Sequence, residues 1–160
     1  MAFVRYKDVG GRRYYQLVRN YRENGRHRQE VLYHLGKYST LDEAIGAERR
    51  MEIRLQDELA RSYRQAARLR EKILHNRRER FGNEIPSIEE ARNIRKKALE
   101  LYKEGKSSED LRIARLEEQL AENIREYYVQ QRFVSMESDI IESIQKKIDE
   151  LLDLKQKYQV

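Results

Sequence analysis

Residues 2–36 read AFVRYKDVGGRRYYQLVRNYRENGRHRQEVLYHLG, and this stretch decides the fold of the N-terminal part of the chain. Two pairs of turn residues, Gly10-Gly11 and Asn24-Gly25, separate runs that are rich in Val, Tyr and Leu. Such pairs are typical of two-residue type I′ hairpins, because both central residues of that turn need a positive φ. The pattern predicts strands at residues 2–9, 12–23 and 26–35, joined as an antiparallel three-stranded meander.

The residues after the third strand predict a helix that covers one face of this sheet. Three strands alone leave a face unsupported. Thr40 and Glu43 have the spacing of a capping box, and apolar residues follow near helical spacing. A helix from here to about Phe81 would be roughly 60 Å long at 1.5 Å per residue. Its first turns are therefore expected to pack on the sheet, and the remainder is expected to project.

Two further helices are predicted after a break at residues 82–87, which contain the only proline, Pro86. Ser87 and Glu90 repeat the capping-box pattern, and the helix that they begin is expected to stop at Gly105. The predicted fold class is α+β: an N-terminal three-stranded antiparallel sheet packed on a helix, followed by long helices in a coiled coil or helical bundle. The predicted domains are residues 1–50, a basic sheet with the start of a helix, and residues 51–160, the long-helix region.

The last helical segment carries an apolar heptad seam. Ile141, Ile144, Ile148 and Leu151 recur at spacings of three and four residues after a polar interruption at residues 135–139. A seam of this kind is buried either against other helices of the same chain or against another molecule, and the sequence leaves both alternatives open. These four residues are the candidate oligomerisation residues, and a homo-oligomer or a helical protein partner is expected.

The charge is distributed unevenly along the chain. Residues 1–40 contain nine Lys and Arg against three acids, a net charge of +6, together with six of the eleven tyrosines. Residues 41–106 have a net charge of +4 and residues 107–160 of −4. A basic, tyrosine-rich head on an acidic tail favours a polyanion-binding module joined to a part with another role.

The composition limits the other possibilities. The chain has no cysteine, so it has neither disulfides nor thiolate metal sites. It shows no signal peptide and no run near the ~20 apolar residues of a membrane span. A cytoplasmic protein that contacts no membrane is expected.

Alternation along the strands predicts which residues share a face. The expected core face consists of Val4, Tyr6, Tyr14, Val18, Val31, Tyr33 and Leu35. The opposite face is rich in arginine, and Leu17 also falls on it. Arginine and lysine neutralise phosphates, arginine reads guanine edges, and a small sheet can enter the major groove of DNA. The alternative is that exposed strands carry such residues for solubility and edge protection.

Residues 35–44, LGKYSTLDEA, resemble the Leu-Gly-x-Phe-x-Thr-x-x-Glu-Ala passage of the ethylene-response-factor DNA-binding domain. They are similar also to the arm-binding domains of phage and transposon integrases. In both families three strands precede a helix and the sheet docks in the major groove. This resemblance covers about residues 2–50; His34 and Leu17 stand where the plant domain has Trp and Glu. With Arg26 added from the same strand face, the implied contacts with duplex DNA are Arg5, Lys7, Arg13, Tyr15, Arg19, Arg26, Arg28 and His34.

A second resemblance covers residues 3–37. YYQLVR at residues 14–19, GRHRQ at residues 25–29 and LG at residues 35–36 resemble the N-terminal segment of certain bacterial insertion-sequence transposases. Those proteins continue into a large catalytic domain with three dispersed carboxylates, for which 160 residues are too few. Both resemblances imply DNA and mobile elements.

No catalytic constellation is visible in the sequence. His27, His34 and His75 lack metal-ligand spacing, and the helical glutamates are typical of solvated faces and caps. We therefore expect no catalytic residue, no metal and no cofactor. The leading hypothesis is a non-enzymatic DNA-binding accessory or regulatory protein, whose basic sheet binds duplex DNA and whose helices oligomerise or dock on a partner. The alternative is a coiled-coil adaptor or assembly protein whose basic sheet binds protein or RNA.

Overall fold

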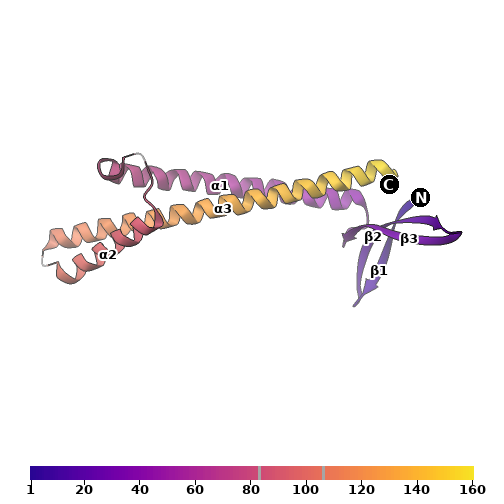
Figure 1. Ribbon diagram of the computed structural model, residues 1–160, viewed down its shortest axis with the longest axis horizontal. Helices are drawn as coiled ribbons and strands as arrows, with labels where there is room; N and C mark the ends of the chain where they lie inside the picture. Colours follow the sequence, from indigo (N-terminus) through magenta and orange to yellow (C-terminus); the bar gives the residue numbers. More distant parts are fainter. Residues whose placement is uncertain (83, 106) are drawn as a thin grey trace. The chain divides into compact units, whose positions relative to one another are not determined.

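The computed structural model contains a three-stranded antiparallel sheet followed by three helices (Figure 1). The strands are β1 (Ala2–Val9), β2 (Arg12–Glu23) and β3 (Arg26–Gly36), and the helices are α1 (Leu41–Phe81), α2 (Ile88–Glu104) and α3 (Ser108–Tyr158). The structure describes residues 1–82, 84–105 and 107–160, so position 83 of the predicted break at residues 82–87 lies outside the described residues. The predicted α+β fold class is confirmed, and the predicted strand boundaries hold to within one residue.

Both hairpins turn on the predicted residue pairs. The φ angles are 57° and 74° at Gly10 and Gly11, and 52° and 76° at Asn24 and Gly25. Two successive positive φ angles define a type I′ turn, whose twist matches that of the strands which it joins. The turn residues therefore fix how the strands pair.

The register brings three apolar residues to one face of the sheet. Val4 pairs with Leu17, and Leu17 pairs with Tyr33. Directly paired residues of an antiparallel sheet have side chains on the same side. Two register shifts then leave Leu32 and Leu35 of β3 without a partner on β2. Such bulges break the strict alternation of faces along β3.

One compact unit consists of residues 1–56 and 139–160. Its core joins the sheet to α1 and to the C-terminal part of α3, and consists of Leu17, Leu35, Leu41, Ala44, Ile45 and Leu151. We call the sheet face that carries Val4, Leu17 and Tyr33 the inner face, and the opposite one the outer face. The predicted domain boundary near residue 50 divides the chain once, whereas this unit is assembled from two separate segments.

The apolar seam of α3 is buried within this unit. The exposed fractions of Ile141, Ile144, Ile148 and Leu151 are 8%, 4%, 7% and 1%. Beside the seam, Gln145 donates a hydrogen bond to Glu52 at 2.9 Å, and Lys155 binds Asp42 at 2.5 Å. These contacts pair α3 with α1 of the same chain. The four seam residues are thus covered within the chain, which is one of the two alternatives that the sequence left open.

A second unit consists of residues 57–138, which include the rest of α1, all of α2 and the first part of α3. The three helices share one core, made of Ile73, Ala91, Ile94, Leu120, Ala121 and Ile124. The helix α2 begins with the predicted capping box. The Ser87 hydroxyl accepts from the backbone N–H of Glu90, and the Glu90 carboxylate accepts from the backbone N–H of Ser87. This arrangement satisfies two backbone donors at the start of the helix.

Candidate nucleic-acid interface

The outer face of the sheet is basic. By the register of the strands, its basic residues are Arg5, Lys7, Arg12 and Arg22. The polar uncharged and histidine side chains on the same face are Gln16, Asn20, His27, Gln29 and His34. No acidic residue of the three strands lies on this face.

The acidic residues of the strands all lie on the inner face, where each binds an arginine of that face. The three pairs and their N–O distances are Asp8–Arg13 at 3.7 Å, Glu30–Arg19 at 2.6 Å and Glu23–Arg28 at 2.9 Å. These carboxylates offset the charge of the inner-face arginines. The positive charge of the outer face has no such compensation within the sheet.

A hydrogen-bond network around Arg5 occupies the centre of the outer face. The Nε and Nη2 of Arg5 donate to Oε1 of Gln16 at 3.3 and 3.2 Å, and its Nη1 donates to Oε1 of Gln29. The Nε2 of Gln16 lies 3.1 Å from Nδ1 of His34. Since the Gln16 Nε2 can only donate, His34 Nδ1 accepts, and this assigns the ring proton to Nε2. The network orients Arg5 and leaves the His34 Nε2–H as a further donor.

The Arg5–Gln29 hydrogen bond crosses the central strand. Arg5 pairs with Gln16, and Gln29 pairs with Asn20, so Val18 lies between them on β2. The side chain of Val18 is 0% exposed although it belongs to the outer face. The hydrogen bond between Arg5 and Gln29 thus runs diagonally across the strand at Val18, and it holds the Arg5 side chain across the middle of the sheet.

The predicted DNA contacts divide between the two faces. Arg5, Lys7 and His34 lie together on the outer face, whereas Arg13, Tyr15, Arg19, Arg26 and Arg28 lie on the inner face. Tyr15 packs beside the hydrophobic core. The hydrogen bond and charge of Glu30, followed by those of Tyr158 in α3, raise the pKa of Arg19. The structure therefore does not bring the eight predicted residues into one surface.

The predicted core face is wrong for half of the sheet. Its members that pack in the core are Val4, Tyr33 and Leu35. Tyr14 and Val31 lie on the outer face and are 41% and 38% exposed, and Tyr6 is 56% exposed on the inner face. Val18 is buried as predicted, at 0% exposure, but its side chain lies on the outer face. Leu17, which the alternation placed outside, is 0% exposed in the core.

Two physical causes explain this correction. A two-residue turn at Gly10-Gly11 pairs Val9 with Arg12, and counting back along the strands pairs Val4 with Leu17. The predicted turn thus already contained the signal that identifies Leu17 as a core residue and Arg12, Gln16, Asn20 and Arg22 as outer-face residues. The bulges in β3 left no such signal in the sequence.

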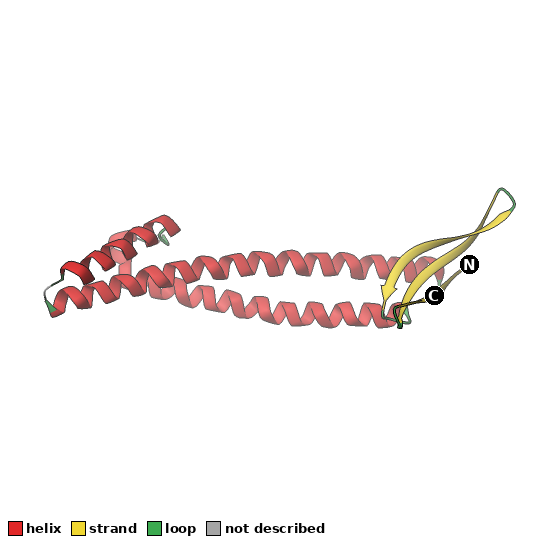
Figure 2. Cartoon of the chain, turned by 90° about the horizontal axis from the view of Figure 1, so that it is seen from below, coloured by secondary structure: helices red, strands yellow, loops and turns green. Residues whose placement is uncertain are grey.

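The distal part of the β2–β3 hairpin extends away from the helices of its own unit (Figure 2). Its residues are mostly exposed on both strands. Near the tip, Arg22 donates to the Nε2 of His27, its partner across the hairpin, at 3.3 Å. Basic residues therefore continue along a two-stranded ribbon, a shape that fits the width of the DNA major groove.

The described residues contain no group of three or more His, Cys, Asp or Glu side chains arranged to hold a metal ion. Within residues 1–82, 84–105 and 107–160, none of the helices combines the length and the hydropathy that a bilayer crossing requires.

The fold and the surface define a twisted three-stranded sheet that is basic on one face and mounted on helices by the other. Residues 3–68 match the family model of the N-terminal domain of IS1634 family transposases. The match covers β2, β3, nearly all of β1 and α1 as far as Arg68. It supports the resemblance to insertion-sequence transposases rather than that to ethylene-response factors and integrases. Comparisons with curated proteins and with solved structures gave no match.

Proposed function

We propose that the protein binds duplex DNA through the outer face of its sheet and that it acts with a mobile element. The single observation that carries the proposal is the separation of charge between the faces. Four basic residues without an acidic neighbour share the outer face, and every strand carboxylate lies on the other. The similarity of residues 3–68 to a transposase N-terminal domain supports the same function.

Different outer-face residues suit different parts of the DNA. Lys7, Arg12 and Arg22 are spread over β1 and β2 and suit phosphate contacts, which supply most of the affinity. Gln16 lies on the central strand β2, and the side chain of Arg5 reaches over it from the edge strand β1, where base edges would be reached. Arginine pairs with guanine and glutamine with adenine in the major groove. The orientation of Arg5 by two glutamines lowers the entropy lost when it binds.

A titration of the whole protein with a fluorescent duplex, at several salt concentrations, tests this proposal. Arg12→Ala and Arg22→Ala are each expected to reduce the slope of log K against log salt by about 0.9, the value for one lost phosphate contact. Arg13→Ala and Arg28→Ala are matched controls, because they remove exposed arginines of the same sheet from the inner face. Equal losses from both pairs, or no duplex binding at low salt, would overturn the proposal.

We also propose that the protein is not a catalyst. Carboxylates of the helices serve structural contacts: Glu90 caps α2, and Glu118 accepts a hydrogen bond from the Tyr102 hydroxyl at 3.0 Å. Incubation with supercoiled plasmid and Mg²⁺ is expected to leave the plasmid intact. Nicking that copurifies with the protein and is lost on substitution of a carboxylate would contradict this expectation.

A further inference from the structure

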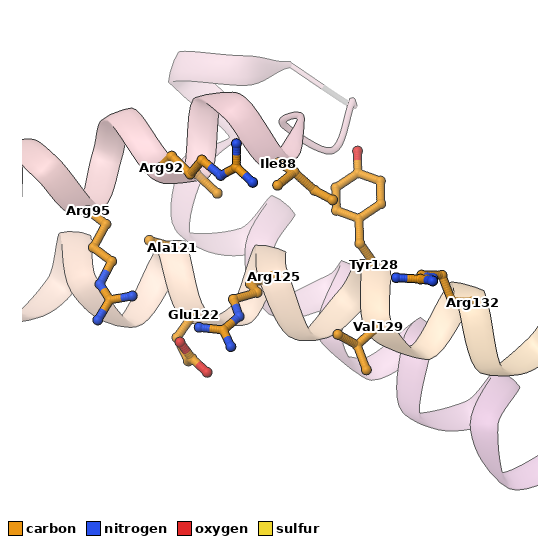
Figure 3. A pocket seen from close by; sticks show the side chains of 10 residues that line it. Ile88, Arg92, Arg95, Ala121, Glu122, Arg125, Tyr128, Val129 and Arg132 are labelled. Atoms are coloured by element: carbon orange, nitrogen blue, oxygen red, sulfur yellow. The ribbon is translucent and has the colours of Figure 1, made fainter.

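A groove between α2 and α3 in the second unit is open to a ligand. It has a volume of about 420 Å³. Its apolar lining consists of Ile88, Ala91, Ala121, Tyr128 and Val129. Figure 3 shows Ile88 and the Tyr128 ring next to each other at one end, one from each helix. Ile88 is 44% exposed and Val129 is 42% exposed, so apolar surface remains uncovered here.

The rim of this groove is strongly basic. Its charged residues are Arg92 and Arg95 from α2, and Glu122, Arg125 and Arg132 from α3. Within the described part of the chain, none of the four arginines takes part in a hydrogen bond or an ion pair. Four guanidinium groups against one carboxylate give the rim of the groove a positive excess.

An exposed apolar stripe continues from the groove along α3. Val129, Phe133 and Met136 follow one another at spacings of four and three residues, and they are 42%, 48% and 56% exposed. Residues at these spacings lie on one side of a helix. The stripe starts with a groove residue, so groove and stripe form one continuous apolar surface about two helical turns long.

We propose that this surface binds an acidic amphipathic helix of a partner protein. Apolar side chains at helical spacing on such a helix would fill the groove and cover the stripe, and flanking carboxylates would bind the arginines. Nucleic acid fits less well, because four of the five apolar lining residues are aliphatic and leave only the Tyr128 ring for stacking on bases. A second copy of the chain fits less well too, because the exposed stripe adjoins arginines that would face their own equivalents. The proposal is independent of DNA binding by the sheet.

The probe for a direct test is a fluorescein-labelled peptide of about three heptads, with leucine at the two seam positions, glutamate beside them and alanine elsewhere. Glutamates beside the seam keep the peptide monomeric at neutral pH. The whole protein is expected to bind it, and not to bind a version with lysine in place of glutamate. Arg92→Glu combined with Arg125→Glu is expected to weaken binding by about tenfold or more.

Matched control variants distinguish peptide binding at the groove from general effects of charge and hydrophobicity on binding. Lys96→Glu combined with Lys97→Glu makes the same charge change on α2 outside the groove and is expected to leave binding unchanged. Val129→Ser is expected to weaken binding, whereas Leu99→Ser, an aliphatic residue of α2 with 46% exposure, is not. Circular dichroism confirms that each variant keeps its helices.

Amide NMR of the unsubstituted protein gives a readout that does not depend on any variant. Addition of the glutamate peptide is expected to shift the signals of Ala91, Ala121 and Val129 and to spare the sheet. No binding, equal weakening by both double variants, or shifts spread over the protein would overturn the proposal. Two other results would also overturn it. One is a dimer, seen in light scattering, that dissociates when Arg92 and Arg125 are substituted. The other is a loss of affinity for duplex DNA in the same variant while its peptide binding is unchanged.

Discussion

Leu151→Ala is expected to destabilise the sheet, although residue 151 is far from the strands in the sequence. The side chain of Leu151 is 1% exposed and packs in one cluster with Leu17, Ala44 and Ile45. It therefore connects β2, α1 and α3. Alanine leaves a cavity at this junction, because two helices and a sheet cannot all move in to fill it.

The size of the effect follows from the atoms that are lost. Three carbon groups at about 0.8 kcal/mol each give about 2.4 kcal/mol of lost burial. The residual cavity raises the expected cost to about 3 kcal/mol, within the range observed for buried leucines. A change of this size corresponds to a factor of about 100 in an equilibrium constant.

Native-state hydrogen exchange measures this cost where it arises. Amide protection in β2 is expected to fall by about 100-fold in Leu151→Ala, while amides of residues 57–138 provide an internal reference. Leu152→Ala is the matched control, since Leu152 is 38% exposed on the same helix. Its cost is expected to be below about 1 kcal/mol, the lower end of the range for truncating an apolar side chain.

Two results would refute the reasoning. One is an equal loss of protection in β2 from both leucine substitutions, which would mean that Leu151 is not the residue that joins α3 to the sheet. The other is a midpoint of unfolding that rises with protein concentration and loses this dependence in Leu151→Ala. That behaviour is expected of an intermolecular seam, whereas an intramolecular core is insensitive to concentration.

The remaining predictions concern local structure. Thr40→Ala should cost about 1 kcal/mol in urea unfolding because the Thr40 hydroxyl accepts from the Glu43 N–H, and Thr40→Ser should cost less. Hydrogen bonds from Ser39 lower the pKa of Glu43. The stability that they contribute is therefore present above the pKa of the unfolded state and is lost as the pH falls through the pKa of the folded state. Glu43→Gln should remove this dependence of the free energy of unfolding on acidic pH. Gly25→Ala should destabilise the protein by about 1 kcal/mol, because the φ angle of Gly25 is 76°. Gly46→Ala in α1 should stabilise it by about 0.5 kcal/mol in the same assay, because the added Cβ would lie 3.4 Å from Nη1 of the flexible Arg50 side chain.

Local chemistry made much of this fold predictable. Asn24-Gly25 can supply two positive φ angles, and Ser87 with Glu90 can cap a helix, whatever the rest of the chain does. Strand ends and helix starts therefore follow from short segments. The partner of the α3 seam does not, because a heptad seam such as that around Ile148 packs equally well on the same chain or on another. The seam is buried against α1 of the same unit.

The candidate site was harder to predict because it depends on register over the whole sheet. Charge alone points to residues 1–40, and alternation along the strands places Arg5, Lys7 and His34 on one face, as the register does. The predicted faces of β2 were exchanged, as if its alternation were shifted by one residue, although the two-residue turn determines how β2 pairs with β1. In β3 the apolar residues Leu32 and Leu35 occupy bulges, and only tertiary packing selects those positions.

The same register that builds the core also sorts the charges. A shift of β2 by one residue would carry Leu17 out of the core, bring Arg12 and Arg22 to the inner face and place Glu23 on the outer one. The charge of the segment would remain +6, but the outer face would no longer be free of acids. Burial of Leu17 and exposure of an uncompensated basic face are therefore two consequences of one pairing. The hydrophobic core selects the surface on which DNA binding is proposed, and the net charge of the segment does not.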